Sequence, residues 1–216
     1  MTIKMNMEIA KSELAETINK LEELIKFSFN KKLNLHSTIG AKYGELYVAY
    51  QLYNHNPLLA SWRTESESIK RRKTSADIIL DNYGKKIEVK WGALHHLDND
   101  YYYEKAGKIE HWGWGFSQGN QFNEDSFHYV VLLAAKRNLA VPEHIFVCTC
   151  SELKDNMERR VSGEGGKDKY TYFLHYSDTK KFYEKPENNV LKIEKSLYND
   201  PKYQERWLTL KKNGSI

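Results

Sequence analysis

Residues 75–91, with the sequence Ser-Ala-Asp-Ile-Ile-Leu-Asp-Asn-Tyr-Gly-Lys-Lys-Ile-Glu-Val-Lys-Trp, decide the fold of this 216-residue chain. Two apolar runs lie on either side of residues 81–84, whose Asp, Asn and Gly favour tight turns. The stretch therefore predicts a β-hairpin with strands at 75–80 and 86–91. Asp77, Glu88 and Lys90 interrupt these strands. A charge inside an apolar strand costs several kcal/mol unless it has a partner or a function, so we expect these residues to form a site.

The geometry of a hairpin brings the three charges together. Glu88 and Lys90 are two residues apart on one strand, so they share a face, while Val89 faces the core. A turn at 81–84 can place Asp77 beside Glu88. Two carboxylates there can hold Mg²⁺, which prefers oxygen ligands, lowers the pKa of a bound water and offsets charge on a phosphate. Lys90 can orient or help to deprotonate that water and stabilise the transition state, so the group suits phosphodiester hydrolysis.

The spacing of these residues resembles the signature of the PD-(D/E)XK nuclease superfamily, the restriction-endonuclease-like nucleases. Asp77 is followed by ten residues and then by Glu88-Val89-Lys90, which matches an acid on one strand and acid-x-Lys on the next. Glu45, within an apolar helical stretch at 37–54, matches the glutamate that often completes the family's site. Ala76 stands where the family often has proline, a departure that the family tolerates.

The resemblance implies an α/β fold with a restriction-endonuclease-like core, αβββαβ, in which a central mixed β-sheet is flanked by helices. On this chain the implied core comprises a helix at 37–54, strands at 58–65, 75–80 and 86–91, a helix before Asn123 and a strand at 127–135.

The resemblance also implies a role for each site residue. Asp77, Glu88 and the main-chain carbonyl of Val89 would ligate Mg²⁺, for which Mn²⁺ can substitute. Lys90 would act on the attacking water. Glu45 would bind a second metal ion or a metal-bound water.

The rest of the chain adds segments to both ends of this core. We expect a single nuclease domain over residues 1–216, with a catalytic core at about 37–150. Residues 7–29 have apolar side chains at helical spacing and predict an N-terminal helix. Residues 144–150 predict a further buried strand, and residues 151–216 a C-terminal elaboration. Within that elaboration we expect a helix at 151–160, a strand at 170–176 and a helix at about 201–211.

Several polar segments are candidates for DNA contacts. Lys70, Arg71, Arg72 and Lys73 precede the Asp77 strand, where they could bind backbone phosphates or form an ordinary solvated loop. The formal net charge of +4 is compatible with nucleic acid without requiring it. Gln118 and Gln121 could contact the catalytic face, or they could be polar loop residues.

The aromatic and glycine-rich segments leave two interpretations open. The three tyrosines at 101–103, with Trp112 and Trp114, could stack on bases, or they could fill the core or a dimer contact. Residues 163–166, Gly-Glu-Gly-Gly, could contact DNA or form a plain hairpin connection. The histidines of the same region have no zinc-ligand spacing, and they suit the surface or a DNA contact.

The cysteines and the hydropathy pattern indicate the cellular compartment in which we expect the protein. Cys148 and Cys150 are one residue apart on an expected strand, so their side chains would point to opposite faces and make a poor disulfide. Reduced thiols suit the cytoplasm. No apolar run approaches the length of about 18 residues that a membrane span needs, and residues 1–10 lack the apolar core of a signal peptide. We therefore expect a cytoplasmic protein without membrane association.

Together these features favour a Mg²⁺-dependent type II restriction endonuclease that hydrolyses double-stranded DNA at a specific short site. Cleavage of both strands at a palindrome predicts a two-fold symmetric homodimer, and the resemblance implies a cognate DNA methyltransferase as functional companion. One alternative is a structure-specific or repair nuclease that resembles Holliday-junction resolvases. Another is a non-catalytic DNA-binding module whose acids are structural.

Overall fold

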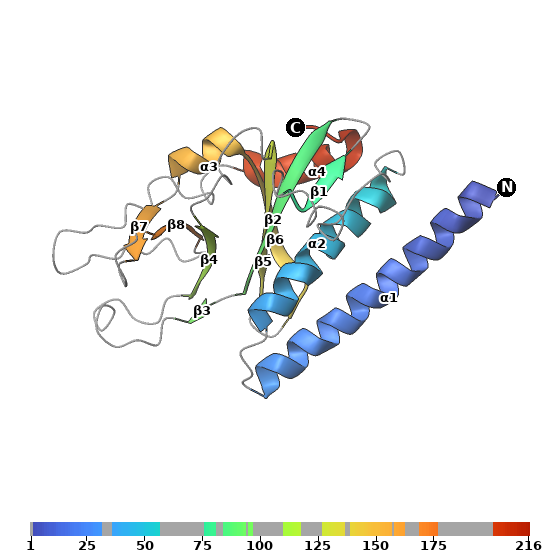
Figure 1. Cartoon of the computed structure of the whole chain (residues 1–216), viewed down its shortest axis with the longest axis horizontal. Coiled ribbons are helices and arrows are strands. Elements are labelled where there is room, and N and C mark those ends of the chain that lie inside the picture. Colours follow the sequence, from blue (N-terminus) through green and yellow to red (C-terminus); the bar gives the residue numbers. More distant parts are fainter. Residues whose placement is uncertain are drawn as a thin grey trace.

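A computed structural model gives the fold of the chain (Figure 1). It describes residues 2–31, 36–56, 76–80, 84–93, 95–96, 110–117, 127–136, 139–156, 158–162, 169–176 and 201–216. The elements follow in the order α1 (Thr2–Asn30), α2 (His36–His55), β1 (Ile78–Leu80), β2 (Lys85–Ala93), β3 (His95–His96), β4 (Glu110–Ser117), β5 (Tyr129–Ala135), β6 (Pro142–Thr149), α3 (Cys150–Asn156), β7 (Glu158–Ser162), β8 (Lys169–Tyr176) and α4 (Lys202–Asn213). No helix within these ranges is long and apolar enough to cross a membrane.

The main sheet has four strands in the order β1-β2-β5-β6. β1 and β2 are antiparallel, with Ile78 opposite Ile87, whereas β2 and β5 are parallel, with Glu88 opposite Val130. β5 and β6 are antiparallel. The chain is therefore an α/β protein with an open, mixed sheet flanked by helices, as the sequence predicted.

The decisive hairpin forms where the sequence placed it. β1 and β2 are its two strands, and Gly84 at their junction has φ of 59°. That backbone conformation lies in the left-handed region that glycine adopts without a steric penalty. Residues 81–83 of the turn and the expected strand at 58–65 lie outside the described residues.

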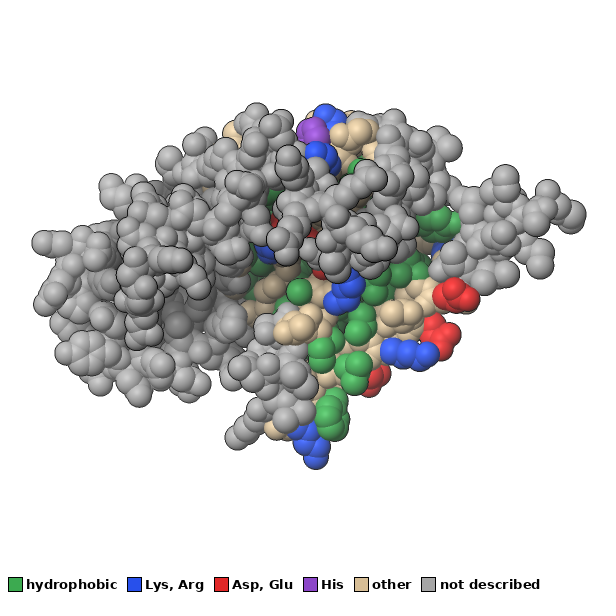
Figure 2. All heavy atoms as spheres, in the orientation of Figure 1, with side chains coloured by type: hydrophobic (Ala, Val, Ile, Leu, Met, Phe, Trp, Pro, Cys, Tyr) green, Lys and Arg blue, Asp and Glu red, His purple; other side chains and the backbone are tan. Residues whose placement is uncertain are grey.

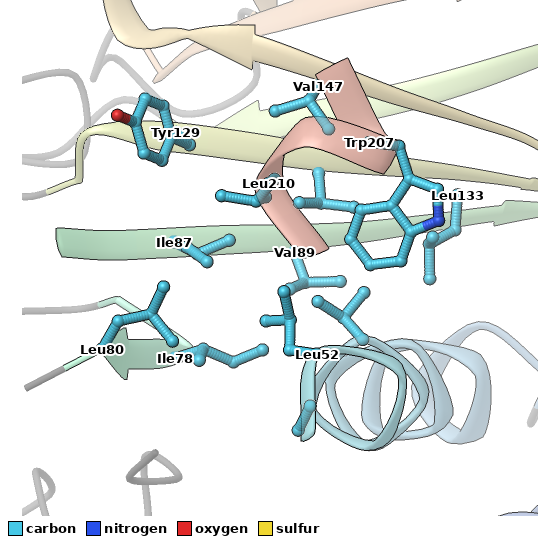
Figure 3. Packing of buried hydrophobic residues seen from close by; sticks show 13 residues of the cluster. Leu52, Ile78, Leu80, Ile87, Val89, Tyr129, Leu133, Val147, Trp207 and Leu210 are labelled. Atoms are coloured by element: carbon cyan, nitrogen blue, oxygen red, sulfur yellow. The ribbon is translucent and has the colours of Figure 1, made fainter. Parts of the chain in front are cut away.

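One face of the main sheet packs against α2 and α4 (Figure 3). Ile87 and Val89 of β2 point to this face, where they meet Leu52 of α2. Trp207 and Leu210 of α4 join the same cluster. The expected helix near 201–211 is thus confirmed, and this part of the C-terminal elaboration contributes to the core.

α2 approaches β2 closely because two glycines face the strand. A Cβ atom added at Gly40 would lie 2.2 Å from the Trp91 ring, and one at Gly44 would lie 3.1 Å from the Trp91 Cβ. The expected N-terminal helix is also confirmed as α1, which lies along α2 (Figure 1) and buries Ile18 and Ile25 in a third cluster. Figure 2 shows acidic and basic side chains along the outer edge of α1, where Lys20 pairs with Glu16.

A second sheet, in the order β3-β4-β8-β7, stands beside the other face of the main sheet (Figure 1). Its strand β4 occupies part of the segment in which a helix before Asn123 was expected, so that prediction is wrong over residues 110–117. The reason is the sequence Trp-Gly-Trp-Gly-Phe, which alternates large and small residues at the period of a strand. Trp112 and Trp114 are buried, and their Nε1 groups donate to the carbonyls of Ala135 and Leu133. The tryptophans therefore fill the core.

The segment after β6 differs from the predicted one in two respects. The expected strand at 144–150 ends at Thr149, and Cys150 begins α3, because a capping box forms there. The Thr149 hydroxyl accepts from the Glu152 amide, and the Glu152 carboxylate accepts from the Thr149 amide. The expected helix at 151–160 ends at Asn156, and β7 follows, paired with β8. Cys148 and Cys150 are both buried, and they form no disulfide with each other. The expected strand at 170–176 is confirmed as β8.

Candidate functional site

Asp77 lies one residue before β1, beside the strand that carries Glu88 and Lys90. The pairing of Ile78 with Ile87 brings Asp77 next to Glu88 on the adjoining strand. The Oδ2 atom of Asp77 accepts a hydrogen bond of 2.7 Å from the Val89 amide. Only 8% of Asp77 and 5% of Glu88 is exposed, so both carboxyl groups are inside the protein.

Glu88 and Lys90 share the face of β2 opposite to Val89. In the parallel pairing with β5, Glu88 lies opposite Val130 and Lys90 opposite Leu132. Both partners belong to the buried cluster that contains Trp112 and Trp114 of β4. The Lys90 ammonium donates to Glu88 Oε1 at 2.5 Å. The second sheet therefore adjoins the face of the main sheet on which the acid and the lysine lie.

Glu45 reaches the site from α2. Its side chain is 12% exposed and forms an ion pair with Lys42, one helical turn earlier. Its charge acts on both Asp77 and Lys90. The structure thus brings together the residues that the sequence predicted as catalytic: Asp77, Glu88, Lys90 and Glu45.

The crowding of carboxylates shifts the protonation of the site. Burial is the largest cause and the proximity of Glu88 is the second, and they raise the pKa of Asp77 from 3.8 to about 8. The hydrogen bond from Val89 opposes this rise only in part. Burial alone would lower the pKa of Lys90, but the neighbouring acids, Glu88 foremost, outweigh it and the pKa is raised. Lys90 is therefore a cation at neutral pH.

The donor set fits a hard divalent cation. Across the described ranges, no three side chains of His, Cys, Asp or Glu converge closely enough to hold a metal ion. Mg²⁺ in proteins commonly takes only one or two carboxylates and completes its shell with waters and substrate phosphates. Asp77 and Glu88 supply such a pair, and a cation between them would favour the ionised form of Asp77. The Val89 carbonyl stays a predicted third ligand.

Some predicted contacts fall outside the part of the chain that the structure describes. These are the basic run Lys70, Arg71, Arg72 and Lys73, the glutamines Gln118 and Gln121, the tyrosines at 101–103 and the glycine-rich residues 163–166.

Sequence reasoning missed one residue of the site, Lys42. It lies three residues before Glu45, a spacing that places two helical side chains side by side. This spacing in the sequence could have predicted the ion pair between Lys42 and Glu45.

No family model, no curated protein and no solved structure matches this chain.

Proposed function

We propose that the chain is a Mg²⁺-dependent endonuclease with a restriction-endonuclease-like core. The observation that carries the proposal is the cluster of the buried acids Asp77 and Glu88 with the partly buried Lys90 and Glu45. These are the residue types that metal-assisted phosphodiester hydrolysis requires. The order of a helix, an antiparallel pair of strands and a further strand parallel to the second agrees with such a core.

Each residue would have a defined role. When bound, Mg²⁺ would polarise the phosphate and lower the pKa of a water. Asp77 and Glu88 would hold the ion. Lys90, kept protonated by the carboxylates around it, would orient the attacking water or donate to a phosphate oxygen rather than act as a base. Glu45 would support Lys90 and bind a metal-bound water.

The substrate that we propose is double-stranded DNA with a short specific sequence, as for a type II restriction endonuclease. A single cluster cuts one strand, so cleavage of both strands at a palindrome would use a homodimer. A DNA methyltransferase that modifies the same sequence would be the companion in the cell.

Digestion of a plasmid of known sequence in Mg²⁺ tests the proposal. We expect discrete fragments from the parent protein and a loss of cleavage rate of roughly 10²-fold or more in Glu88→Gln and Lys90→Met. Glu143→Gln is the matched control, because Glu143 lies on β6 and pairs with the partly exposed Lys136. Equal cleavage by the parent and Glu88→Gln, or none by either, would contradict the proposal.

Two other results would favour an alternative function over the one proposed. Cleavage of branched but not linear DNA would indicate a structure-specific or repair nuclease that resembles Holliday-junction resolvases. Tight DNA binding without metal-dependent turnover would indicate a non-catalytic DNA-binding module.

A further inference from the structure

An open hollow of about 230 Å³ lies at the end of the main sheet, apart from the acid cluster. β2 and β5 begin there and β6 ends there, since Ile87, Tyr129 and Thr149 lie side by side across the three strands. It is lined by residues of β2, β5, β6 and α3 and of the segment before β5: Lys85, Phe127, His128, Tyr129, Thr149, Cys150 and Ser151. We call this feature the end hollow.

The lining of the end hollow is positively charged. Within the described residues, Lys85 forms no ion pair, and its ammonium lies 5.9 Å from the centroid of the Tyr129 ring. Glu152, the residue after Ser151 in sequence, is engaged by Arg206 at 2.6 Å. Glu152 also accepts hydrogen bonds from the amide and hydroxyl of Thr149. Among the described residues, no acid therefore pairs with the Lys85 ammonium.

A hydrogen bond from the backbone fixes the tautomer of His128, another residue of the lining. Its Nδ1 accepts a hydrogen bond of 3.1 Å from the Lys86 amide, so in the neutral ring the proton is on Nε2. Burial first, and then the charges of Lys85 and Lys86, lower the pKa of His128 and favour this neutral form. The backbone carbonyl of His128 accepts from the Cys150 amide, which fixes the position of the residue between β5 and α3.

The remaining lining adds a hydroxyl and two aromatic rings. Ser151 is exposed at the start of α3, and its hydroxyl lies 3.1 Å from that of Thr149. Phe127 and Tyr129 are buried and are among the residues that line the hollow. A cation, a neutral imidazole donor and a hydroxyl around one space suit an oxyanion that accepts several hydrogen bonds.

We propose that the end hollow is a phosphate subsite that takes a backbone phosphodiester group of the nucleic-acid substrate. This inference rests on the proposed function. Lys85 precedes Glu88 by three residues on β2, which corresponds to about 10 Å along a strand. Because this spacing is an odd number of residues, Lys85 and Glu88 lie on opposite faces of β2, so the subsite would hold a different phosphate from the one being cut. It positions the substrate and carries no sequence information.

Binding of a short labelled duplex, measured in EDTA by fluorescence anisotropy over a salt series, tests the subsite without any cleavage. For Lys85→Met we expect weaker binding and a slope of log K against log salt that is smaller by about 0.9, the value for one lost phosphate contact. Lys136→Met is the matched control, because Lys136 follows the opposite end of β5. For Ser151→Lys we expect tighter binding and a steeper slope, a gain that misfolding cannot imitate.

The outcomes separate the subsite from the nuclease proposal. Unchanged affinity and slope in both Lys85→Met and Ser151→Lys would overturn the subsite, whether or not the parent cuts DNA. The expected changes in a parent that fails to cut would support the subsite while the nuclease proposal fails.

A titration of the parent with inorganic phosphate, followed through the His128 ring signals by NMR, distinguishes the source of the phosphate. A shift at His128 that Lys85→Met abolishes would show that a free phosphate suffices, whereas binding of duplex alone would show that the subsite needs the DNA backbone.

Discussion

Asp77→Asn is expected to stabilise the protein while it removes a residue of the proposed active site. The asparagine side chain has almost the same shape as the carboxyl group and can still accept the hydrogen bond from the Val89 amide. It cannot ionise. Burial and the proximity of Glu88 raise the pKa of Asp77 to about 8, against 3.8 for the group in an unfolded chain. Each unit of pKa difference corresponds to about 1.36 kcal/mol, so ionising Asp77 inside the folded protein costs at most about 6 kcal/mol.

The sign of the effect follows from proton linkage. Between pH 4 and 8 the unfolded chain has already lost the Asp77 proton, whereas the folded protein retains it. The stability that Asp77 contributes is therefore full below about pH 4, declines as pH rises, and is lost above about pH 8. The stability of Asp77→Asn lacks this decline. Its free energy of unfolding should therefore equal that of the parent near pH 4 and exceed it by several kcal/mol at pH 9.

Urea denaturation in EDTA at pH 4, 7 and 9, followed by tryptophan fluorescence, measures this difference. The matched control is Glu23→Gln, because Glu23 is an exposed acid on α1. The difference in the free energy of unfolding between Glu23→Gln and the parent should stay constant across the same pH range. Addition of Mg²⁺ at pH 8 should stabilise the parent more than Asp77→Asn, since a ligand stabilises the state that binds it. If the free energies of unfolding of the parent and Asp77→Asn differ by the same amount at pH 4, 7 and 9, the electrostatic reasoning for this site is refuted.

Three further predictions concern the packing around the site. Gly40→Ala should destabilise by about 1–3 kcal/mol in urea denaturation, because the added Cβ would lie 2.2 Å from the Trp91 ring; stability equal to the parent would contradict this close approach. Trp207→Ala should cost about 3–5 kcal/mol, since the ring is buried in the main cluster, whereas Leu208→Ala, on the exposed side of the same helix, should stay within about 0.5 kcal/mol. The Cys148 thiol should react slowly with a disulfide reagent in the native state and quickly in urea, because burial raises its pKa to about 12; equally fast reaction in both states would show that it is accessible.

The hairpin and its site were predictable because local rules and burial agree there. Ile87 and Val89 alternate with Glu88 and Lys90, so the sequence itself separates the core face of β2 from its charged face. The turn needed a residue that tolerates positive φ, and Gly84 supplies it. Glu45 was predicted through the resemblance to the nuclease superfamily, and its charge acts on Asp77 and Lys90.

The second sheet was not predictable in the same way. Its strand β4 contains glycines, which disfavour strands, and its pairing partner β8 is more than 50 residues away along the chain. What stabilises β4 is the burial of Trp112 and Trp114 against the main sheet, and no local pattern reveals a contact of that range. The end of the predicted helix at 151–160 was missed for a related reason, because residues 158–162 form β7 only by pairing with β8.

The position of Asp77 explains why the site forms at the edge of the hairpin. β1 has three residues, so the ladder between β1 and β2 ends before it reaches Val89. The Val89 amide would then lack a strand carbonyl, and the Asp77 carboxylate accepts from it instead. A buried amide left without an acceptor costs about 1–3 kcal/mol, so Asp77 has a structural function as well as the proposed catalytic one. The two functions separate by substitution. Asp77→Asn retains the acceptor and loses the charge, whereas Asp77→Ala loses both. If the acceptor matters, Asp77→Ala should be less stable than Asp77→Asn at every pH, by an amount that does not vary with pH because neither variant ionises at this position.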